Sequence, residues 1–318
     1  MVKKLFNRWL KWSEEPYVKV YRGFATEKKV FIHGHLFKGL SLHREKPSTS
    51  FFRNGKEMIK RFVVSPWGHQ RLRIFIADQH YDVRTQANGY FYLIVQSRFN
   101  NHIKYNVQFI HDDFDIVLER EIKVEDNNKH IVVSDVDDTI IISHATNVLK
   151  KIFLLLTRNP QQRKPFEGVV QSYCELEHVP FFFVSSSEWN LYDFIVSFCE
   201  YHKFPFGYYL LQDIKQWKDL FRSGGGDHMH KYEKIRFLID FFEESAFVLI
   251  GDSGQRDALI YSRLANELPE RVESIHIRDI KAKKHKKAMQ ILSTIQSSVK
   301  WELFRDTPDF GAVSVRSE

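Results

Sequence analysis

The sequence has little cysteine and no long hydrophobic run. Two cysteines among the 318 residues, Cys174 and Cys199, cannot build a disulfide framework or a four-cysteine zinc site. The longest purely apolar stretches, such as residues 152–156, are far shorter than the roughly 20 residues that a membrane-spanning helix needs. Charges interrupt residues 1–12 too often for the apolar core of a signal peptide. These absences argue against a secreted scaffold, a membrane-spanning protein and a zinc finger, and we expect a cytoplasmic protein.

The composition describes a folded globular protein with a basic excess. Hydrophobic residues make up 43% and charged residues 27%, and 318 residues suit about two domains. Lys and Arg outnumber Asp and Glu by 47 to 40, which gives a net charge of +7, and they gather at residues 3–11, 150–164 and 281–287. Such clusters suit nucleic acid or an anionic membrane surface, and ordinary solvated surface explains each of them equally well.

The first half, residues 1–127, has the pattern of short strands. Ile103, Tyr105, Val107 and Phe109 alternate with polar residues, and Asn88-Gly89 is a tight-turn signal. Further β-prone runs are expected at residues 30–37, 62–65 and 114–124. This spacing predicts a small antiparallel β-sandwich used for binding or packing.

The second half, residues 128–290, alternates β-prone and helical runs and is followed by a C-terminal extension, 291–318. The alternation predicts an α/β domain with a parallel sheet, in which ligands bind at the carboxyl ends of the strands. We expect strands at 130–133, 180–184, 206–211, 246–250 and 274–277, with helices at 166–178, 188–203, 231–244 and 256–267.

Two acids directly follow the first of these strands. Asp135 and Asp137 are two residues apart, so on an extended backbone they can face one side of a site. Such a pair suits a hard cation such as Mg²⁺, and a carboxylate can also attack phosphorus while its neighbour transfers a proton. A solvated acidic loop explains the pair as well. A calcium loop is excluded, because Ile140 and Thr146 stand where it needs Gly and Glu.

Polar groups follow the other strands in the same way. Serines 185–187 stand where a helix begins, a place that binds phosphate or simply caps the helix. Lys231 opens a later helix, where a cation opposes the helix dipole. Asp252 and Asp257 form a second acidic pair in a loop with Gly251 and Gly254.

The order of these motifs resembles the haloacid dehalogenase superfamily of phosphatases. Residues 134–140 (Ser-Asp-Val-Asp-Asp-Thr-Ile), 184–189 (Val-Ser-Ser-Ser-Glu-Trp), 230–231 (His-Lys) and 249–257 (Leu-Ile-Gly-Asp-Ser-Gly-Gln-Arg-Asp) resemble more closely the Mg²⁺-dependent phosphatidate phosphatases of the actin-patch-protein type, which are related to the lipins. The resemblance covers about residues 130–280. It implies a Rossmann-like parallel sheet of the haloacid dehalogenase type, preceded by a smaller β-rich domain.

The resemblance also implies roles for individual residues. Asp135 would be the nucleophile and Asp137 the general acid and base. Ser185, Ser186 and Lys231 would hold the phosphoryl group. The Mg²⁺ ligands would be Asp135, Asp252 and the carbonyl of Asp137, with Asp257 as a further candidate. The sequence departs from the family at Ile141, where a Lys is usual, and at residues 186–188, where Asn-Ser-Pro is usual.

Two segments suggest a lipid substrate. The apolar residues 147–156 are followed by Arg158, Arg163 and Lys164, of which Arg163 and Lys164 are candidate substrate-binding residues. Residues 1–12 combine basic residues with Trp9 and Trp12, the pattern of a helix that lies on a membrane. A helix packed on the core, or on the β-domain, explains each segment as well.

The function that these observations predict is Mg²⁺-dependent hydrolysis of a phosphomonoester through an aspartyl-phosphate, with phosphatidate as substrate and diacylglycerol as product. The alternatives are a phosphatase of soluble phosphoesters and a non-catalytic module that binds lipid phosphates. No nucleic-acid partner is expected, because no recognised module accompanies the basic charge. The expected location is cytoplasmic, with peripheral binding to the inner membrane surface as a further option.

Overall fold

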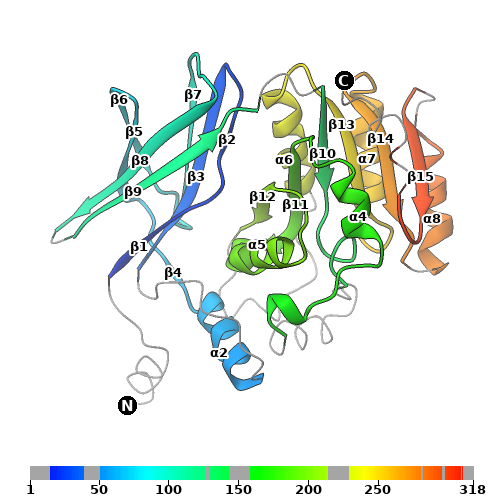
Figure 1. Ribbon diagram of the computed structural model, residues 1–318, viewed down its shortest axis with the longest axis horizontal. Helices are drawn as coiled ribbons and strands as arrows, with labels where there is room; N and C mark the ends of the chain where they lie inside the picture. The colour runs from blue at the N-terminus through cyan, green and yellow to red at the C-terminus, as the bar shows by residue number, and fades with distance from the viewer. Residues whose placement is uncertain are drawn as a thin grey trace. The chain divides into compact units, whose positions relative to one another are not determined.

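The computed structural model describes residues 15–38, 51–112, 114–125, 129–142, 158–213, 229–280, 282–295, 298–308 and 310 (Figure 1). The chain divides into two compact units. The first contains residues 1–45, 56–126 and 213–218, and the second contains 46–55, 127–212 and 219–318. The predicted segments 1–12 and 147–156 lie outside the described residues. Among the described residues, no helix is long and apolar enough to cross a membrane.

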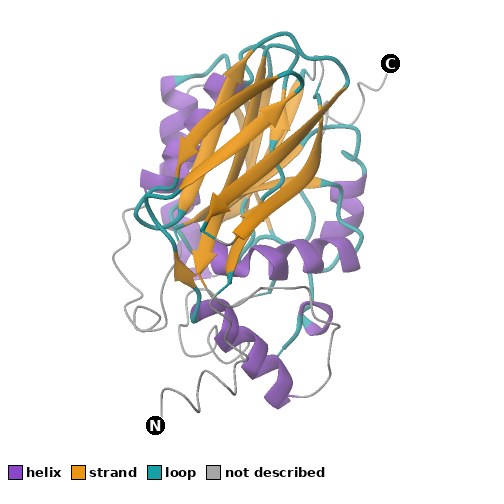
Figure 2. Cartoon of the chain, turned by 90° about the vertical axis from the view of Figure 1, so that its left-hand side faces the viewer, coloured by secondary structure: helices purple, strands orange, loops and turns teal. Residues whose placement is uncertain are grey.

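The first unit contains two antiparallel sheets, whose strands are joined largely by short loops (Figure 2). One sheet contains β1 (Pro16–Val20), β2 (Phe24–Ala25), β3 (Lys29–Lys38), β4 (Ser65–Pro66) and β7 (Tyr90–Gln96). The other has the order β6-β5-β8-β9, with β5 (Arg71–Ile76), β6 (Gln79–Arg84), β8 (His102–His111) and β9 (Phe114–Lys123).

Both sheets contribute to one hydrophobic core. The alternation of apolar and polar residues in the sequence indicates which side chains of β8 belong to it. Ile103, Tyr105, Val107 and Phe109 of β8 are all buried in a cluster that also contains Ile32 of β3. The predicted turn is also confirmed: Gly89 has φ +77°, and the Asn88 side chain accepts a hydrogen bond from the backbone of Tyr90 at 3.0 Å.

One predicted strand of this half is wrong. Residues 62–65 are not a strand, because helix α2 (Phe51–Phe62) continues to Phe62 and β4 contains only Ser65–Pro66. The buried side chains Asn54, Met58 and Phe62 are spaced four residues apart, which places them on one face of a helix. A run of four residues is too short to reveal that period.

The second unit contains a six-stranded parallel sheet with the order β12-β11-β10-β13-β14-β15. The five predicted strands are confirmed as β10 (His130–Ser134), β11 (Phe181–Glu188), β12 (Gly207–Gln212), β13 (Ala246–Asp252) and β14 (Val272–Arg278). Strand β15 (Lys300–Phe304) was not predicted. It pairs with β14 and belongs to the segment assigned to a C-terminal extension.

The predicted helices of this half are also present. They correspond to α4 (Val169–Cys174), η2 (Trp189–Leu191) with α5 (Tyr192–Tyr201), α6 (Met229–Phe241) and α7 (Asp257–Glu267). Two further elements, η1 (Pro160–Gln162) and α8 (Ala282–Leu292), were not predicted. A parallel sheet with helical connections, together with antiparallel sheets, confirms the mixed α/β class.

The order of the parallel strands fixes where a site can form. After β10 the chain adds β11 and β12 on one side of it, and then returns to add β13 on the other side. The connections after β10 and β13 therefore lead away from each other at the carboxyl edge and leave a crevice between them. Open α/β sheets bind ligands at such a switch point.

Candidate active site

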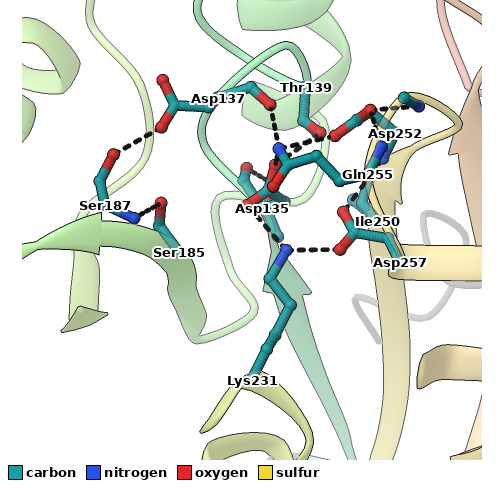
Figure 3. Close-up of polar contacts among 12 residues, drawn as sticks. Asp135, Asp137, Thr139, Ser185, Ser187, Lys231, Ile250, Asp252, Gln255 and Asp257 are labelled. Atoms are coloured by element: carbon teal, nitrogen blue, oxygen red, sulfur yellow. Dashed lines mark hydrogen bonds and ion pairs between the residues drawn. The ribbon is translucent and has the colours of Figure 1, made fainter. Parts of the chain in front are cut away.

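Asp135 and Asp252 stand side by side at this switch point. Strands β10 and β13 pair in register, with Ser134 opposite Ile250, and the Asp135 N–H donates to the Ile250 carbonyl at 2.8 Å. Asp135 is the first residue after β10, and Asp252 is the last residue of β13. Both carboxylates therefore reach the same sheet edge, as their positions after the strands predict (Figure 3).

A buried lysine joins these acids to a third. The Lys231 ammonium, from α6, donates to Asp135 at 2.9 Å and to Asp257 at 2.5 Å. All of these side chains are at most 4% exposed, and the carboxylate oxygens of Asp135, Asp252 and Asp257 lie within 4.8 Å of one another. The sequence predicted these four residues at one edge, and the structure brings them together.

Three buried carboxylates with one lysine carry an excess of negative charge. Burial raises the pKa of Asp135 to about 7, although the nearby Lys231 ammonium opposes the shift. Burial, with repulsion from Asp257 and Asp135, raises the pKa of Asp252 well above its usual range. For Lys231, burial alone would lower the pKa, but the carboxylates of Asp135 and Asp257 raise it overall. The cluster therefore favours an additional positive charge.

The loop after β13 holds Asp252 with backbone and side-chain donors. The N–H groups of Gly254 and Gln255 donate to one Asp252 oxygen, at 2.5 and 3.0 Å. The Gln255 amide donates to the other Asp252 oxygen at 3.0 Å, to the Asp137 carbonyl at 3.1 Å and to Asp135 at 3.4 Å. Three oxygens from two strand ends thus converge on one nitrogen.

This convergence fits a divalent cation. Carboxylate and carbonyl oxygens are the ligands that Mg²⁺ prefers, and the Gln255 amide lies where these oxygens meet. Asp135, Asp252 and Asp257 could therefore hold a metal ion, with the Asp137 carbonyl beside them. The Asp137 carboxylate is not part of this group of three acids, and the predicted ligand of this residue is its carbonyl.

Gly251 is required for this arrangement. A Cβ built on Gly251 would lie 2.5 Å from a carboxylate oxygen of Asp257. The same Asp257 carboxylate accepts the Asp252 N–H at 3.2 Å. Only glycine lets Asp257 approach the strand so closely, which explains the glycine at the end of β13.

The Asp137 side chain points elsewhere, toward the end of β11. Ser187 Oγ donates to the Asp137 carboxylate at 2.5 Å, and the Ser187 N–H donates to Ser185 Oγ at 3.0 Å. Ser185 and Ser187 are buried, and Ser186 between them is half-buried. The predicted serines therefore lie beside Asp137, and Ser187 contacts it directly.

Residues 130–279 match the catalytic domain of phosphatidate phosphatase APP1. The match confirms the resemblance inferred from the motifs, and it spans the elements that carry Asp135, Lys231 and Asp252.

Two curated yeast proteins are similar to this chain. An uncharacterized protein of Schizosaccharomyces pombe is 24% identical over 212 residues, which cover 63% of this chain and 34% of that protein. Phosphatidate phosphatase APP1 of Saccharomyces cerevisiae is 29% identical over 153 residues, which cover 46% of this chain and 25% of that protein. The aligned part of this chain therefore spans about a third or a quarter of these relatives.

Solved structures resemble the chain only weakly. A carbohydrate acetylesterase from Xanthomonas citri aligns with 92% of this chain and 71% of its own, at 8% sequence identity and a TM-score of 0.33. This score is too low for a shared fold to be inferred.

The two predicted substrate-binding residues lie beside the loop that follows Asp135. Arg163 is buried, and its guanidinium donates to the Ile142 carbonyl at 3.0 Å and lies 6.0 Å from the Phe194 ring. Burial lowers its pKa. Lys164 is exposed, and its carbonyl accepts the Ile142 N–H at 3.2 Å. Both residues therefore support the end of the loop that follows Asp135.

Sequence reasoning missed four residues of the candidate site. Thr139 donates to Asp135 at 3.2 Å, and Ser187 and Gln255 make the contacts described above. These three stand inside recognised motifs, so a closer study of the motifs could have found them. The fourth, Arg278, is the last residue of β14 and carries no such signal.

Arg278 anchors the loop that carries the first motif. Its Nε donates to the Thr139 carbonyl at 3.1 Å, and its guanidinium lies between the rings of Phe166 and Phe304, at 4.3 and 4.7 Å. It also donates to the carbonyls of Arg305 and Asp306. A planar cation with several donors suits this buried place, because it can stack and bond at the same time.

Proposed function

We propose that this protein is a Mg²⁺-dependent phosphatidate phosphatase that works through an aspartyl-phosphate. The observation that carries the proposal is the buried contact of Asp135 with Lys231 at the switch point of a domain that matches the APP1 catalytic domain. Phosphoryl transfer depends on positioning and on neutralising charge, and this cluster supplies groups for both.

The proposal includes a sheet of the haloacid dehalogenase type and a magnesium site. Asp135, Asp252 and Asp257, with the Asp137 carbonyl, would hold the ion after the Gln255 amide moves aside. Bound Mg²⁺ would supply positive charge that keeps the buried carboxylates ionised and neutralises the phosphate oxygens. The raised pKa values of Asp135 and Asp252 support a cation at this place.

The side chains of this domain then have separate tasks. Asp135 attacks phosphorus, so an Asp135–phosphorus bond forms while the bond from phosphorus to the diacylglycerol oxygen breaks. Asp137, oriented by Ser187, donates a proton to that oxygen. In the second step Asp137 takes a proton from water, which attacks phosphorus and releases inorganic phosphate and Asp135. Lys231 stabilises the negative charge that passes through the site.

The lipid substrate and the site of action belong to the same proposal. A phosphomonoester lipid such as phosphatidate offers a headgroup for the cationic site and acyl chains for an apolar surface. Residues 1–12 and 147–156, which combine cations with apolar side chains, are the candidates for contact with an anionic membrane. We propose action in the cytoplasm at the inner membrane surface.

The substitution Asp135→Asn tests this function. An amide cannot form the acyl-phosphate, so phosphate release from phosphatidate in mixed micelles should fall below a few per cent of the wild-type rate. The same assay with and without Mg²⁺ tests the cofactor, and a soluble phosphomonoester tests the substrate class. A folded Asp135→Asn variant with substantial activity would exclude Asp135 as the nucleophile.

The matched control is Asp138→Asn, the same chemical change in the same loop. Asp138 has φ +61°, a conformation that Asn also adopts, so the loop should keep its shape. We expect this variant to retain most of its activity. Equal loss in both variants would show that the loop, and not the Asp135 carboxylate, had been damaged.

A further inference from the structure

A cavity of about 360 Å³ lies beside the loop that carries Asp252, between α7 and α8. This volume is in the range of small-molecule sites, which begin at about 300 Å³. Three cations, Arg256, Lys284 and Lys287, line it together with apolar side chains that include Leu259 and Ile291. We call it the α7–α8 cavity. The proposed phosphatase reaction does not use it.

The charged residues described in the lining of the α7–α8 cavity are all cations. Among the described residues, no acid is part of its lining. Lys284 is fixed there, because its ammonium donates to the Gly254 carbonyl at 2.8 Å, while Arg256 and Lys287 are exposed. The cavity is therefore complementary to an anion.

A contribution to the stability of α8 does not explain why cations gather at the start of this helix. Residues 282–287 contain four lysines at the N-terminal end of the helix, and its first turn contains no acid. Positive charges at this end oppose the helix dipole, and like charges four residues apart repel each other. A bound anion would relieve both effects.

The lining also contains apolar side chains that are partly open to water. Leu259, on α7, is 52% exposed at the cavity, and Ile291, on α8, is half-buried. A small inorganic anion would use the cations and leave these side chains in water. A molecule with an anionic headgroup and a hydrocarbon part would contact the cations and also cover the apolar side chains.

We propose that the α7–α8 cavity binds the headgroup of an anionic phospholipid that is not itself hydrolysed. The occupant would be a lipid of the surface in which the substrate lies. Gln255 lines the cavity while its amide contacts Asp135 and Asp252, so the bound lipid lies next to the reaction site and leaves the carboxylates free.

Titration of the full chain with dihexanoyl phosphatidylglycerol below its micelle concentration, followed by calorimetry, tests this site. This lipid is a phosphodiester and offers no phosphomonoester to the phosphatase reaction. Lys287→Glu should weaken binding about fivefold or more, because each basic residue at an anionic lipid contributes about a fivefold change in affinity. Leu259→Ser should weaken it severalfold by removing apolar contact.

Matched controls make the same changes elsewhere on the surface. Lys300→Glu reverses an exposed charge on β15, and Val117→Ser removes an apolar side chain on β9 that is 51% exposed, so both should bind as the wild type does. Equal effects of Lys287→Glu and Lys300→Glu would overturn the proposal. Absence of wild-type binding would also overturn it.

Inorganic phosphate, titrated in the same way, separates a lipid site from a simple anion site. Affinity for phosphate equal to that for the lipid, with no effect of Leu259→Ser, would overturn the lipid assignment. Phosphate release from a soluble phosphomonoester, measured on the same variants, should be unchanged. Absence of phosphate release from phosphatidate with the wild-type protein would refute the proposed function and leave the binding result standing.

Discussion

At the scale of residues, two neighbouring acids have different surroundings. Asp135 lies in the fully buried cluster with Lys231, whereas the Asp137 carboxylate meets Ser187. Asp138, with φ +61°, turns the chain immediately after them. In the proposed reaction this separation lets one acid attack and the other transfer protons.

The contact between Ser187 and Asp137 gives a kinetic prediction. Ser187→Ala removes the donor that orients Asp137, so kcat should fall about tenfold, because a hydrogen bond to a charged group contributes about 1.5 kcal/mol. KM should change little, since Ser187 contacts the acid and not the bound lipid in this scheme. Steady-state kinetics with a short-chain phosphatidate measures both values. A rise in KM at constant kcat would instead make Ser187 a phosphate ligand.

At the scale of elements, strand β3 carries two histidines without contact to water. His33 and His35 are fully buried, with Tyr90 and Tyr21 hydroxyls at 3.2 and 3.0 Å from their Nδ1 atoms. Burial lowers the pKa of His33 to about 3, and burial with repulsion from His33 lowers the pKa of His35 well below its usual range. Both rings therefore remain neutral in the folded strand.

The buried rings give a prediction for stability against pH. In the unfolded chain a histidine has a pKa near 6.5, so the unfolded state binds more protons between about pH 3 and 6.5, and stability falls as pH decreases through this window. Each ring should lower the free energy of unfolding by about 2 kcal/mol between pH 7 and 5. His33→Gln should reduce this decrease by about that amount.

Amide hydrogen exchange of β3, corrected for the intrinsic rate at each pH, measures this effect. The exposed His80, on β6 in the same unit, provides the control, because His80→Gln removes a ring that stays in water. An unchanged pH dependence in His33→Gln would mean that the ring also titrates normally in the folded strand.

At the scale of the whole molecule, the protein combines an antiparallel β unit with a unit whose residues 130–279 match the APP1 catalytic domain. The basic segment 1–12 contains none of the residues assigned to the reaction. If it lies on membranes, its deletion should weaken binding to anionic vesicles at low salt, where charges attract over longer distances. Vesicle flotation and hydrolysis of a soluble phosphomonoester measure the two properties separately, and hydrolysis should remain nearly unchanged.

Two results would contradict this assignment of residues 1–12. Loss of hydrolysis in parallel with vesicle binding would make the segment part of the folded protein. Unchanged vesicle binding would leave residues 147–156 and the α7–α8 cavity as the membrane contacts. The assignment also requires that vesicle binding by the wild-type protein falls with added salt. The reason is that exposed charges are screened within about 8 Å at physiological ionic strength.

The sequence determined those features that depend on neighbouring residues. Buried runs such as β10 and β13, the turn at Gly89 and the acids after each strand follow from local periodicity and turn chemistry, and all are found in the structure. The parallel arrangement then follows from the alternation of strands and helices. Hence Asp135 and Asp252 could be placed at one edge before their distance was known.

Only the tertiary structure decided which distant groups meet. Gln255 reaches Asp135 across 120 residues of chain, and Arg278 reaches the Thr139 carbonyl across 139. Such contacts depend on the order of the strands in the sheet, and no local sequence pattern reveals that order. The same holds for β15, since a short strand with polar residues is recognised only when its partner β14 is in place. Local chemistry therefore fixed the elements, and the strand order fixed the site.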